Sequence, residues 1–183
     1  MPPPQRTLIL DAEAIAKTLA EMADRIVEVA GRESDLLLVG IQRRGVELAN
    51  RLATLVEART GQAVARGKLD ITLYRDDLQA IGPRPIVGET MLPPTLDGRM
   101  VVIVDDVLYT GRTIRAALDE FADFGRPRRV LLAVLVDRGG RELPIQPDIV
   151  GFHTTAAPGD LVNVSVVELD GVDSAELVPG ATP

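Results

Sequence analysis

Two adjacent carboxylates and a hydroxyl-rich turn stand together in the segment VVIVDDVLYTGRT, which covers residues 101–113. Its opening apolar run, residues 101–104, shows no period-2 alternation, which is typical of a strand that a parallel sheet buries on both faces. Asp105 and Asp106 follow where this strand should emerge, and a helical pattern begins after the turn. A helix start offers free N–H groups and a positive dipole end to an anion. The segment therefore predicts a phosphate site over residues 110–113, where Gly111 would let the backbone approach the ligand closely.

The two carboxylates narrow the class of phosphate ligand. Because carboxylates repel phosphate, Asp105 and Asp106 make chemical sense here if they accept hydrogen bonds from nearby hydroxyl groups or lie near a metal ion. A sugar phosphate carries both hydroxyl groups and a phosphate. The alternative is a buried strand with an acidic end, followed by a capped helix that holds no ligand.

The same segment resembles the signature of the type I phosphoribosyltransferases, in which two acidic residues hold ribose hydroxyls and a Thr-Gly-x-Thr turn holds the 5′-phosphate. The resemblance implies an α/β fold with a mostly parallel central sheet flanked by helices, a small hood and a flexible loop. It also implies that phosphoribosyl pyrophosphate (PRPP) is bound by the carboxylates and the turn, namely Asp105, Asp106, Val107, Leu108, Tyr109, Thr110, Gly111, Arg112 and Thr113.

A second turn, GIQRRG, follows the apolar run of residues 36–39. Turns after parallel strands converge on one crevice, so this loop should face the same ligand as the first turn. Two guanidinium groups suit a second anion, because each offers a fork of donors to phosphate oxygens; the alternative is a solvent-facing basic turn. In the resembling family this is the pyrophosphate loop, here Ile41, Gln42, Arg43 and Arg44. Arg44 matches the family's arginine, whereas Arg43 stands where a small hydroxyl residue is common.

A third loop follows the apolar run of residues 130–136 and should reach the crevice by the same rule. A pyrimidine presents amide-like donors and acceptors along one edge, which the backbone of an irregular loop can read. Arg138 could bond a carbonyl oxygen or stack on the ring. We therefore expect the base at Val136, Asp137, Arg138 and Gly139.

The segment of residues 74–98 is aperiodic and contains several Pro and Gly residues. Segments of this length without structure of their own are usually functional or disordered. We expect a flexible lid that closes over the substrate and excludes water, with Thr72, Tyr74 and Arg75 at its base. The alternative is a long hairpin with a solvated tip.

The remaining patterns predict the elements that position these loops. Helices are expected over residues 11–30, after Arg44 and over 111–124, the last with a face of Ile114, Ala117, Leu118 and Phe121. Strands are expected over residues 36–39, 69–74, 101–104, 130–136, 149–153 and 162–169, with a short connection over 61–66. The tail from Gly171 is expected to fray. Length favours one domain over residues 1–183.

Composition excludes several classes of protein. No apolar run approaches the roughly 20 residues that cross a bilayer, and the first residues lack a long apolar stretch, so we expect neither a signal peptide nor an anchor. The absence of cysteine excludes disulfides and is compatible with a cytoplasmic protein. A net charge of −7 argues mildly against general nucleic-acid binding. His153, the one histidine, has no base or metal partner in suitable spacing and is expected to be a structural or surface residue.

From Leu10 to about Leu177 the chain is similar to the bacterial PyrR group, on the stretches DITLYRDDL, VDDVLYTGRT, GRP, LAVLVDRG and RELPI. The resemblance implies transfer of phosphoribosyl from PRPP to uracil, giving UMP and diphosphate. Asp105, Asp106 and Arg44 would be catalytic, and Mg²⁺ would be bound mainly through PRPP, without a dedicated protein ligand set. A homodimer or higher homo-oligomer is implied, together with uridine-nucleotide-dependent binding to the pyr mRNA leader that causes transcription attenuation.

The surface that binds RNA in this group is basic and draws on the first helix, the segment after an Arg-Gly-His-Arg stretch and the next strand. This chain carries Glu21 and Asp24 on the first helix, Gly140 for the usual histidine and Gln146 for an arginine, and GFHTTAA for a lysine-containing stretch. Losing phosphate contacts weakens binding by orders of magnitude, so we expect RNA binding to be weakened or lost. A non-catalytic regulator or sensor that binds PRPP or UMP is the alternative to an enzyme.

Overall fold

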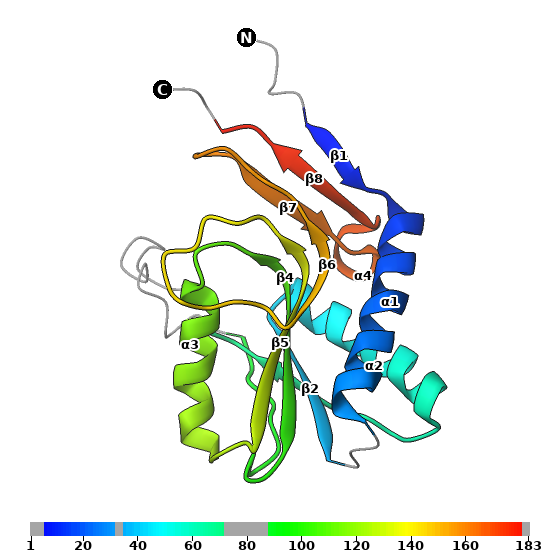
Figure 1. Cartoon of the computed structure of the whole chain (residues 1–183), viewed down its shortest axis with the longest axis vertical. Helices are drawn as coiled ribbons and strands as arrows, with labels where there is room; N and C mark the ends of the chain where they lie inside the picture. Colours follow the sequence, from blue (N-terminus) through cyan, green and yellow to red (C-terminus); the bar gives the residue numbers. More distant parts are fainter. Residues whose placement is uncertain (1–5, 32–34, 72–87, 181–183) are drawn as a thin grey trace.

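The computed structural model describes residues 6–31, 35–71 and 88–180 and is built on a central sheet (Figure 1). Five strands lie in the order β3-β2-β4-β5-β6, and every neighbouring pair is parallel. The strands are β2 (Leu36–Ile41), β3 (Ala65–Leu69), β4 (Met100–Leu108), β5 (Arg129–Asp137) and β6 (Ile149–His153). Because β4 lies between β2 and β5, the three loops that follow these strands are neighbours at one edge of the sheet.

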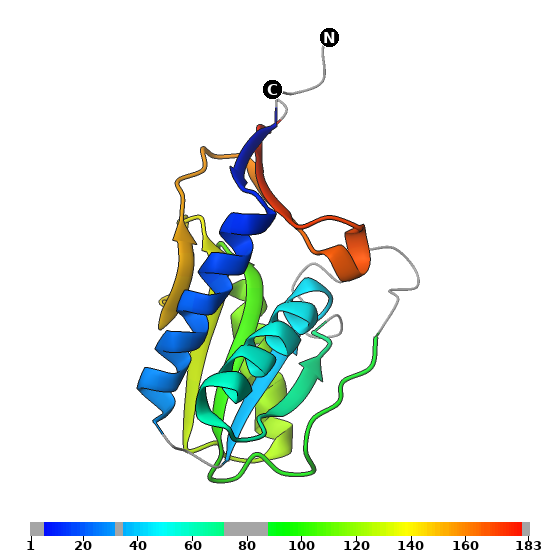
Figure 2. The same cartoon turned by 90° about the vertical axis from the view of Figure 1, so that its right-hand side faces the viewer.

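Helices cover both faces of the sheet, as Figures 1 and 2 show. On one face, α1 (Ala12–Ala30) and α2 (Arg44–Thr60) pack against the side chains of Leu36 and Leu38. On the other face, α3 (Arg112–Phe121) packs against Leu37 and Val39, and a short 3₁₀ turn, η3 (Ala122–Phe124), follows it. Successive residues of a strand point to opposite faces, so the uninterrupted apolar run of β2 serves two cores. The expected α/β fold with helices on both faces of a parallel sheet is confirmed.

A second, antiparallel sheet forms a hood above the carboxyl edge of the main sheet (Figure 1). Its strands are β1 (Thr7–Leu10), β7 (Leu161–Ser165) and β8 (Ser174–Val178), with β8 in the middle. The expectation that the tail from Gly171 frays is therefore wrong. Strand β8 is ordered because β1 and β7 pair with it on both sides, and β1 lies about 170 residues away in sequence, as in Thr7↔Leu177.

The strand predicted over residues 162–169 is wrong in its second half. Strand β7 ends at Ser165, and the short helix α4 (Val167–Asp170) follows. Two carboxylates, one at the end of α4 and one just after it, accept from the N–H groups at the start of α4: Asp170 Oδ2 accepts from Val166 N at 2.9 Å and Asp173 Oδ1 from Val167 N at 2.7 Å. Side-chain acceptors of this kind compete with sheet pairing for the backbone.

Two further expectations need correction. Strand β3 begins at Ala65, inside the predicted connection, and ends at Leu69. It pairs with β2 at the edge of the sheet, and its side chains are mostly polar, so the sequence shows no apolar run there. Arg66 of β3 donates to Glu57 Oε2 of α2 at 2.9 Å. Leu118 does not belong to the buried face of α3, since its side chain is 42% exposed, whereas Ile114, Ala117 and Phe121 are buried.

The other predicted elements occur with some shifted boundaries, and Asp105 and Asp106 lie within β4 instead of directly after it. Helix α1 begins after Asp11, whose Oδ1 accepts from Ala14 N at 2.8 Å, and it ends at Gly31. Strands β2, β4 and β5 each extend beyond the predicted run at their carboxyl ends. Within residues 6–31, 35–71 and 88–180, no helix is both long and apolar enough to cross a bilayer.

Candidate active site

Asp105 and Asp106 lie near the carboxyl end of β4, at the centre of the sheet edge. Asp105 is buried and Asp106 is partly exposed. Backbone N–H groups already orient both carboxylates: Asp106 N donates to Asp105 Oδ1 at 3.0 Å, and Val107 N donates to Asp106 Oδ1 at 2.8 Å. Burial raises the pKa of both groups, and the neighbouring charge of Asp106 raises the pKa of Asp105 further. Such a pair gains most from a ligand that brings hydroxyl donors or positive charge.

The turn after β4 leads into α3 as predicted, with Gly111 as the helix cap. Gly111 adopts φ +93°, and a Cβ there would lie 3.3 Å from Ile145 Cβ, so glycine fits both the backbone conformation and the space. Thr110 Oγ1 accepts from Arg112 N at 3.3 Å, and Thr113 lies in the first turn of α3. The first N–H groups of a helix have no partner within the helix, so this turn is suited to an anion. Val107 and Leu108 belong to β4, and the Leu108 side chain is buried in the core.

The loop between β2 and α2 packs directly against the carboxylates. A Cβ on Gly45 would lie 2.6 Å from Val104 O and 3.3 Å from Asp105 Cα, so the start of α2 touches β4 at Asp105. A Cβ on Gly40 would lie 2.3 Å from Val46 Cα. These two glycines let β2, β4 and α2 meet at one point, which places residues 41–44 beside Asp105. The peptide bond between Gln42 and Arg43 is cis.

The two arginines of this loop differ in their surroundings. Arg44 forms a forked ion pair with Asp170 of α4, from Nε to Oδ2 at 3.0 Å and from Nη2 to Oδ1 at 2.9 Å. Its hydrogen bond to Asp170 holds the pKa of Arg44 above the ordinary value, and the charge of Asp106 acts in the same direction. Arg43 is exposed, and its guanidinium forms no hydrogen bond or ion pair with the residues that the structure describes. The sequence did not indicate that the hood reaches this loop.

Loop residues 136–139 lie at the same edge, at the end of β5, next to β4. Arg138 is almost fully buried: its guanidinium carbon lies 3.8 Å above the Tyr109 ring, and Nη1 donates to Asp160 O at 2.5 Å. These contacts tie Arg138 to the phosphate turn and to the hood, rather than leaving it to project into solvent. A Cβ on Gly140 would lie 2.5 Å from Tyr109 Cε2, so Tyr109 fills the space beside this glycine.

Arg141 is a residue that the sequence did not single out for this site. It donates to Asp137 Oδ2 at 2.7 Å, to Tyr109 O at 2.9 Å and to Ile145 O at 2.9 Å, and its side chain is 13% exposed. It therefore joins the loop of residues 136–139 to the turn after β4. Burial alone would raise the pKa of Asp137, but hydrogen bonds from Arg141 and from Gly139 N outweigh it and lower the pKa. Its sequence signals were its place in the stretch RELPI and its spacing of four residues from Asp137.

Thr72, Tyr74 and Arg75, and most of the predicted lid, lie outside the described residues. The described part of that segment begins at Gly88. It is tied to the pyrophosphate loop, because Gln42 Nε2 donates to Glu89 O at 2.8 Å.

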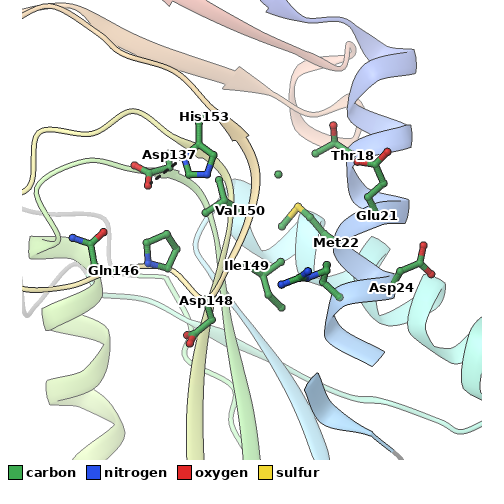
Figure 3. A pocket seen from close by; sticks show the side chains of 13 residues that line it. Thr18, Glu21, Met22, Asp24, Asp137, Gln146, Asp148, Ile149, Val150 and His153 are labelled. Carbon is green, nitrogen blue, oxygen red and sulfur yellow. Dashed lines mark ion pairs between the residues drawn. The ribbon is translucent and has the colours of Figure 1, made fainter. Parts of the chain in front are cut away.

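A cavity of about 610 Å³ lies away from the carboxylate pair, between α1 and β6 (Figure 3). Its lining carries the acidic side chains of Glu21, Asp24 and Asp148. His153 stands at its rim, 3.9 Å from Asp137 Oδ2 and 75% exposed, as expected for a surface residue. The groove thus collects several of the residues by which the chain departs from a basic surface, namely Glu21, Asp24 and Gln146.

Comparisons with known proteins agree with this geometry. A family model described as the phosphoribosyl transferase domain matches residues 5–169. Proteins named "Bifunctional protein PyrR" from Thermus aquaticus and Chloroflexus aurantiacus are 52% and 50% identical, covering 92% and 94% of this chain and 93% and 95% of their own lengths. A third protein of that name, from Clostridioides difficile, is 45% identical over 94% of this chain and 98% of its own.

Solved structures show the same architecture. The hypoxanthine phosphoribosyltransferase of Trypanosoma cruzi matches with a TM-score of 0.72 at 18% identity, covering 95% of this chain and 97% of that one. A hypoxanthine phosphoribosyltransferase of Staphylococcus aureus matches with a TM-score of 0.69 at 16% identity, covering 95% of this chain and 92% of that one. At this level of identity the likeness establishes a shared fold.

Proposed function

Because the chain belongs to the phosphoribosyl transferase domain family, and within it to the PyrR family, we propose that it is a uracil phosphoribosyltransferase, which converts uracil and PRPP into UMP and diphosphate. One observation carries the proposal: Asp105 and Asp106 stand between the starts of two helices, α2 and α3, at a single sheet edge. PRPP has the matching form, a ribose between a 5′-phosphate and a pyrophosphate.

The reaction asks the protein mainly to orient its substrates and to stabilise charge. The N1 atom of uracil forms a bond to C1′ of PRPP while the bond from C1′ to the pyrophosphate oxygen breaks, and the N1 proton is lost. The ribose becomes oxocarbenium-like on the way. Asp105 and Asp106 would accept hydrogen bonds from the ribose hydroxyls and lie close to this positive charge. Residues 110–113 would anchor the 5′-phosphate, and alignment of this kind contributes up to ~7–11 kcal/mol in favourable cases.

The base would lie at residues 136–139, read mainly by backbone groups. Support comes from the rigidity of this loop: Arg138 and Arg141 hold it against Tyr109, which leads into the phosphate turn. The base loop and the phosphate turn are thereby fixed relative to one another. Uracil and ribose could then meet without a large rearrangement.

We propose that Mg²⁺ accompanies PRPP. The donor set fits an ion held mainly by substrate oxygens, because Asp105 and Asp106 supply two carboxylates, and no group of three or more acidic, His or Cys ligands occurs within the described residues. Mg²⁺ commonly binds through one or two carboxylates together with substrate phosphates. When bound, the ion would neutralise charge on the leaving diphosphate.

The second activity that we propose is regulation of the pyr operon through its mRNA leader, at reduced affinity. The relatives are named bifunctional, which supports a second role. The groove between α1 and β6 is the reason for the reduced RNA affinity, because the acidic side chains of Glu21 and Asp148 line it and few basic side chains offset their charge. Arg25, its one arginine, lies 3.7 Å from Glu28 Oε2, and Arg59 forms an ion pair with Asp24.

We further propose that the chain works as one phosphoribosyltransferase domain within a homodimer or a higher homo-oligomer. The non-catalytic sensor is not favoured, since the carboxylate pair, the phosphate turn and the pyrophosphate loop are all present at one edge.

The deciding experiment measures UMP formation from uracil, PRPP and Mg²⁺, with orotate, hypoxanthine and adenine as controls. We expect turnover with uracil alone. Turnover with a different base would overturn the assignment of the base loop. Binding of PRPP or UMP without any turnover would restore the sensor.

A further inference from the structure

We propose that the two arginines of the loop after β2 have separate tasks: Arg43 contacts the leaving pyrophosphate, and Arg44 is a positioning residue that the hood holds through Asp170. This inference rests on the proposed function and deepens it. It differs from the expectations that both guanidinium groups meet the anion and that Arg44 is catalytic.

Arg44 is already committed to a partner. Its Nε and Nη2 both donate to the Asp170 carboxylate. Asp170 is held in place in turn, because its Oδ2 also accepts from Val166 N at 2.9 Å. A guanidinium that turned toward pyrophosphate would give up both charge-assisted bonds and leave Asp170 without its cation. The hydrogen bond to Asp170 and the charges of Asp170 and Asp106 raise the pKa of Arg44, so the guanidinium is held as a cation beside these carboxylates.

The hood segment that carries Asp170 is held in place independently of Arg44. Arg51 of α2 forms ion pairs with Glu168 Oε2 at 2.5 Å and with Asp173 Oδ1 at 2.8 Å, on either side of Asp170. Helix α4 is therefore clamped to α2 at two places, by Arg51 and by Arg44. This clamp fixes the start of α2, which is the part of the helix that touches Asp105.

Arg43 has the properties of the anion contact. It precedes the first residue of α2, where the helix dipole already favours an anion, and it follows the carboxyl end of β2 beside β4. Its side chain is exposed, with no described partner to release before it meets a ligand. A free guanidinium can bond two phosphate oxygens at once.

The test compares ligands that do and do not contain pyrophosphate. Calorimetry would measure the affinities of the full-length protein for PRPP, Mg²⁺-pyrophosphate and UMP, and of the variants Arg43→Gln, Arg44→Gln and Asp170→Asn. Arg129→Gln is the matched control, because Arg129 is exposed at the opposite, amino end of β5.

We expect Arg43→Gln to weaken PRPP and pyrophosphate about 10- to 100-fold, as for a lost charge-assisted contact, with UMP affinity within about twofold. Arg43→Lys should recover part of the loss. Arg129→Gln should change none of the three affinities.

Arg44→Gln and Asp170→Asn should resemble one another, and their combination should be no worse than either alone, since they break the same ion pair. Both should lower kcat more than they raise the KM for PRPP, because the pyrophosphate contact itself stays. Unchanged pyrophosphate affinity in Arg43→Gln, with a selective loss in Arg44→Gln, would overturn the inference. Wild-type protein that binds PRPP without forming UMP would instead overturn the proposed function, and the comparison of variants would still decide the roles of the arginines.

Discussion

Replacing the carboxylate pair, as Asp105→Asn and Asp106→Asn together, should destroy activity and at the same time stabilise the fold. Asp105 is buried and its neighbour Asp106 is partly buried at the centre of the sheet edge, and burial raises the pKa of each. Asparagine has nearly the same shape, and its carbonyl oxygen can still accept the bonds from Asp106 N and Val107 N. It removes only the charge.

The loss of activity follows from the ribose contacts. Each hydrogen bond between a hydroxyl and a carboxylate contributes about 1.5–3 kcal/mol, so two such bonds amount to about 3–6 kcal/mol. At about 1.4 kcal/mol for each tenfold change, kcat/KM should fall by about 10²- to 10⁴-fold. The rate of UMP formation at several PRPP concentrations measures this loss.

The gain in stability follows from proton linkage. For a carboxyl whose pKa rises on folding, the native state binds more protons than the unfolded state at pH values between the two pKa values, so the free energy of unfolding falls as pH rises through that window. The window opens near the ordinary value of 3.8 and extends upward, because the pKa of Asp105 lies well above it. The double variant has no carboxyl groups at these positions, so its free energy of unfolding does not fall with pH for this reason. Its free energy of unfolding should therefore match that of the wild type near pH 3.5 and exceed it at pH 7, as urea unfolding at both pH values would show.

Two results would refute this reasoning. Retained turnover in the double variant would remove Asp105 and Asp106 from the chemistry. A variant that is less stable than the wild type at pH 7 would show that the pair is held by favourable contacts rather than tolerated for function.

Three other predictions concern packing, loop coupling and RNA. Gly40→Ala should lower the free energy of unfolding by about 3 kcal/mol, because the new Cβ would lie 2.3 Å from Val46 Cα; urea unfolding measures it. Arg141→Gln should raise the KM for both uracil and PRPP and destabilise the fold by about 3 kcal/mol, since it leaves Tyr109 O and the Asp137 carboxylate without their donor. Steady-state kinetics with each substrate varied in turn measures the two KM values, and a change in only one of them would contradict this prediction. Gel shifts of a pyr leader at physiological salt should show weak binding that Glu21→Lys with Gln146→Arg strengthens at least tenfold, and nanomolar binding by the wild type would contradict the expectation.

The central sheet and its three loops were predictable because their signals are local. A short apolar run, a turn and a helical pattern follow one another directly in the chain, as in residues 101–113, and parallel topology then brings the strand ends together. The hood was not predictable in this way. Strand β8 is a short pentapeptide, SAELV, whose partner β1 lies at the other end of the sequence, so no local pattern records the pairing.

The same distinction explains which site residues could be named in advance. Asp105, Thr110 and Gly111 lie within seven residues of one another, so a local sequence motif is enough to predict their roles. Arg141 and Asp170 act through partners that only the folded chain brings close, at Tyr109 and Arg44. The side chains that hold the loops in register were therefore the ones that sequence reasoning missed or assigned differently.

The hood links the ends of the chain to the chemistry at its centre. Asp170 lies 126 residues from Arg44 in sequence, and it reaches the pyrophosphate loop only because β7 and β8 pair and the turn between them closes over α2. Since β1 pairs with the other edge of β8, both ends of the chain contribute to the position of α4. The start of α2, which touches Asp105, is therefore supported from two sides, by β4 beneath it and by α4 above it. An arginine held at that junction serves the reaction by keeping the loop in place, which leaves its exposed neighbour to meet the departing anion.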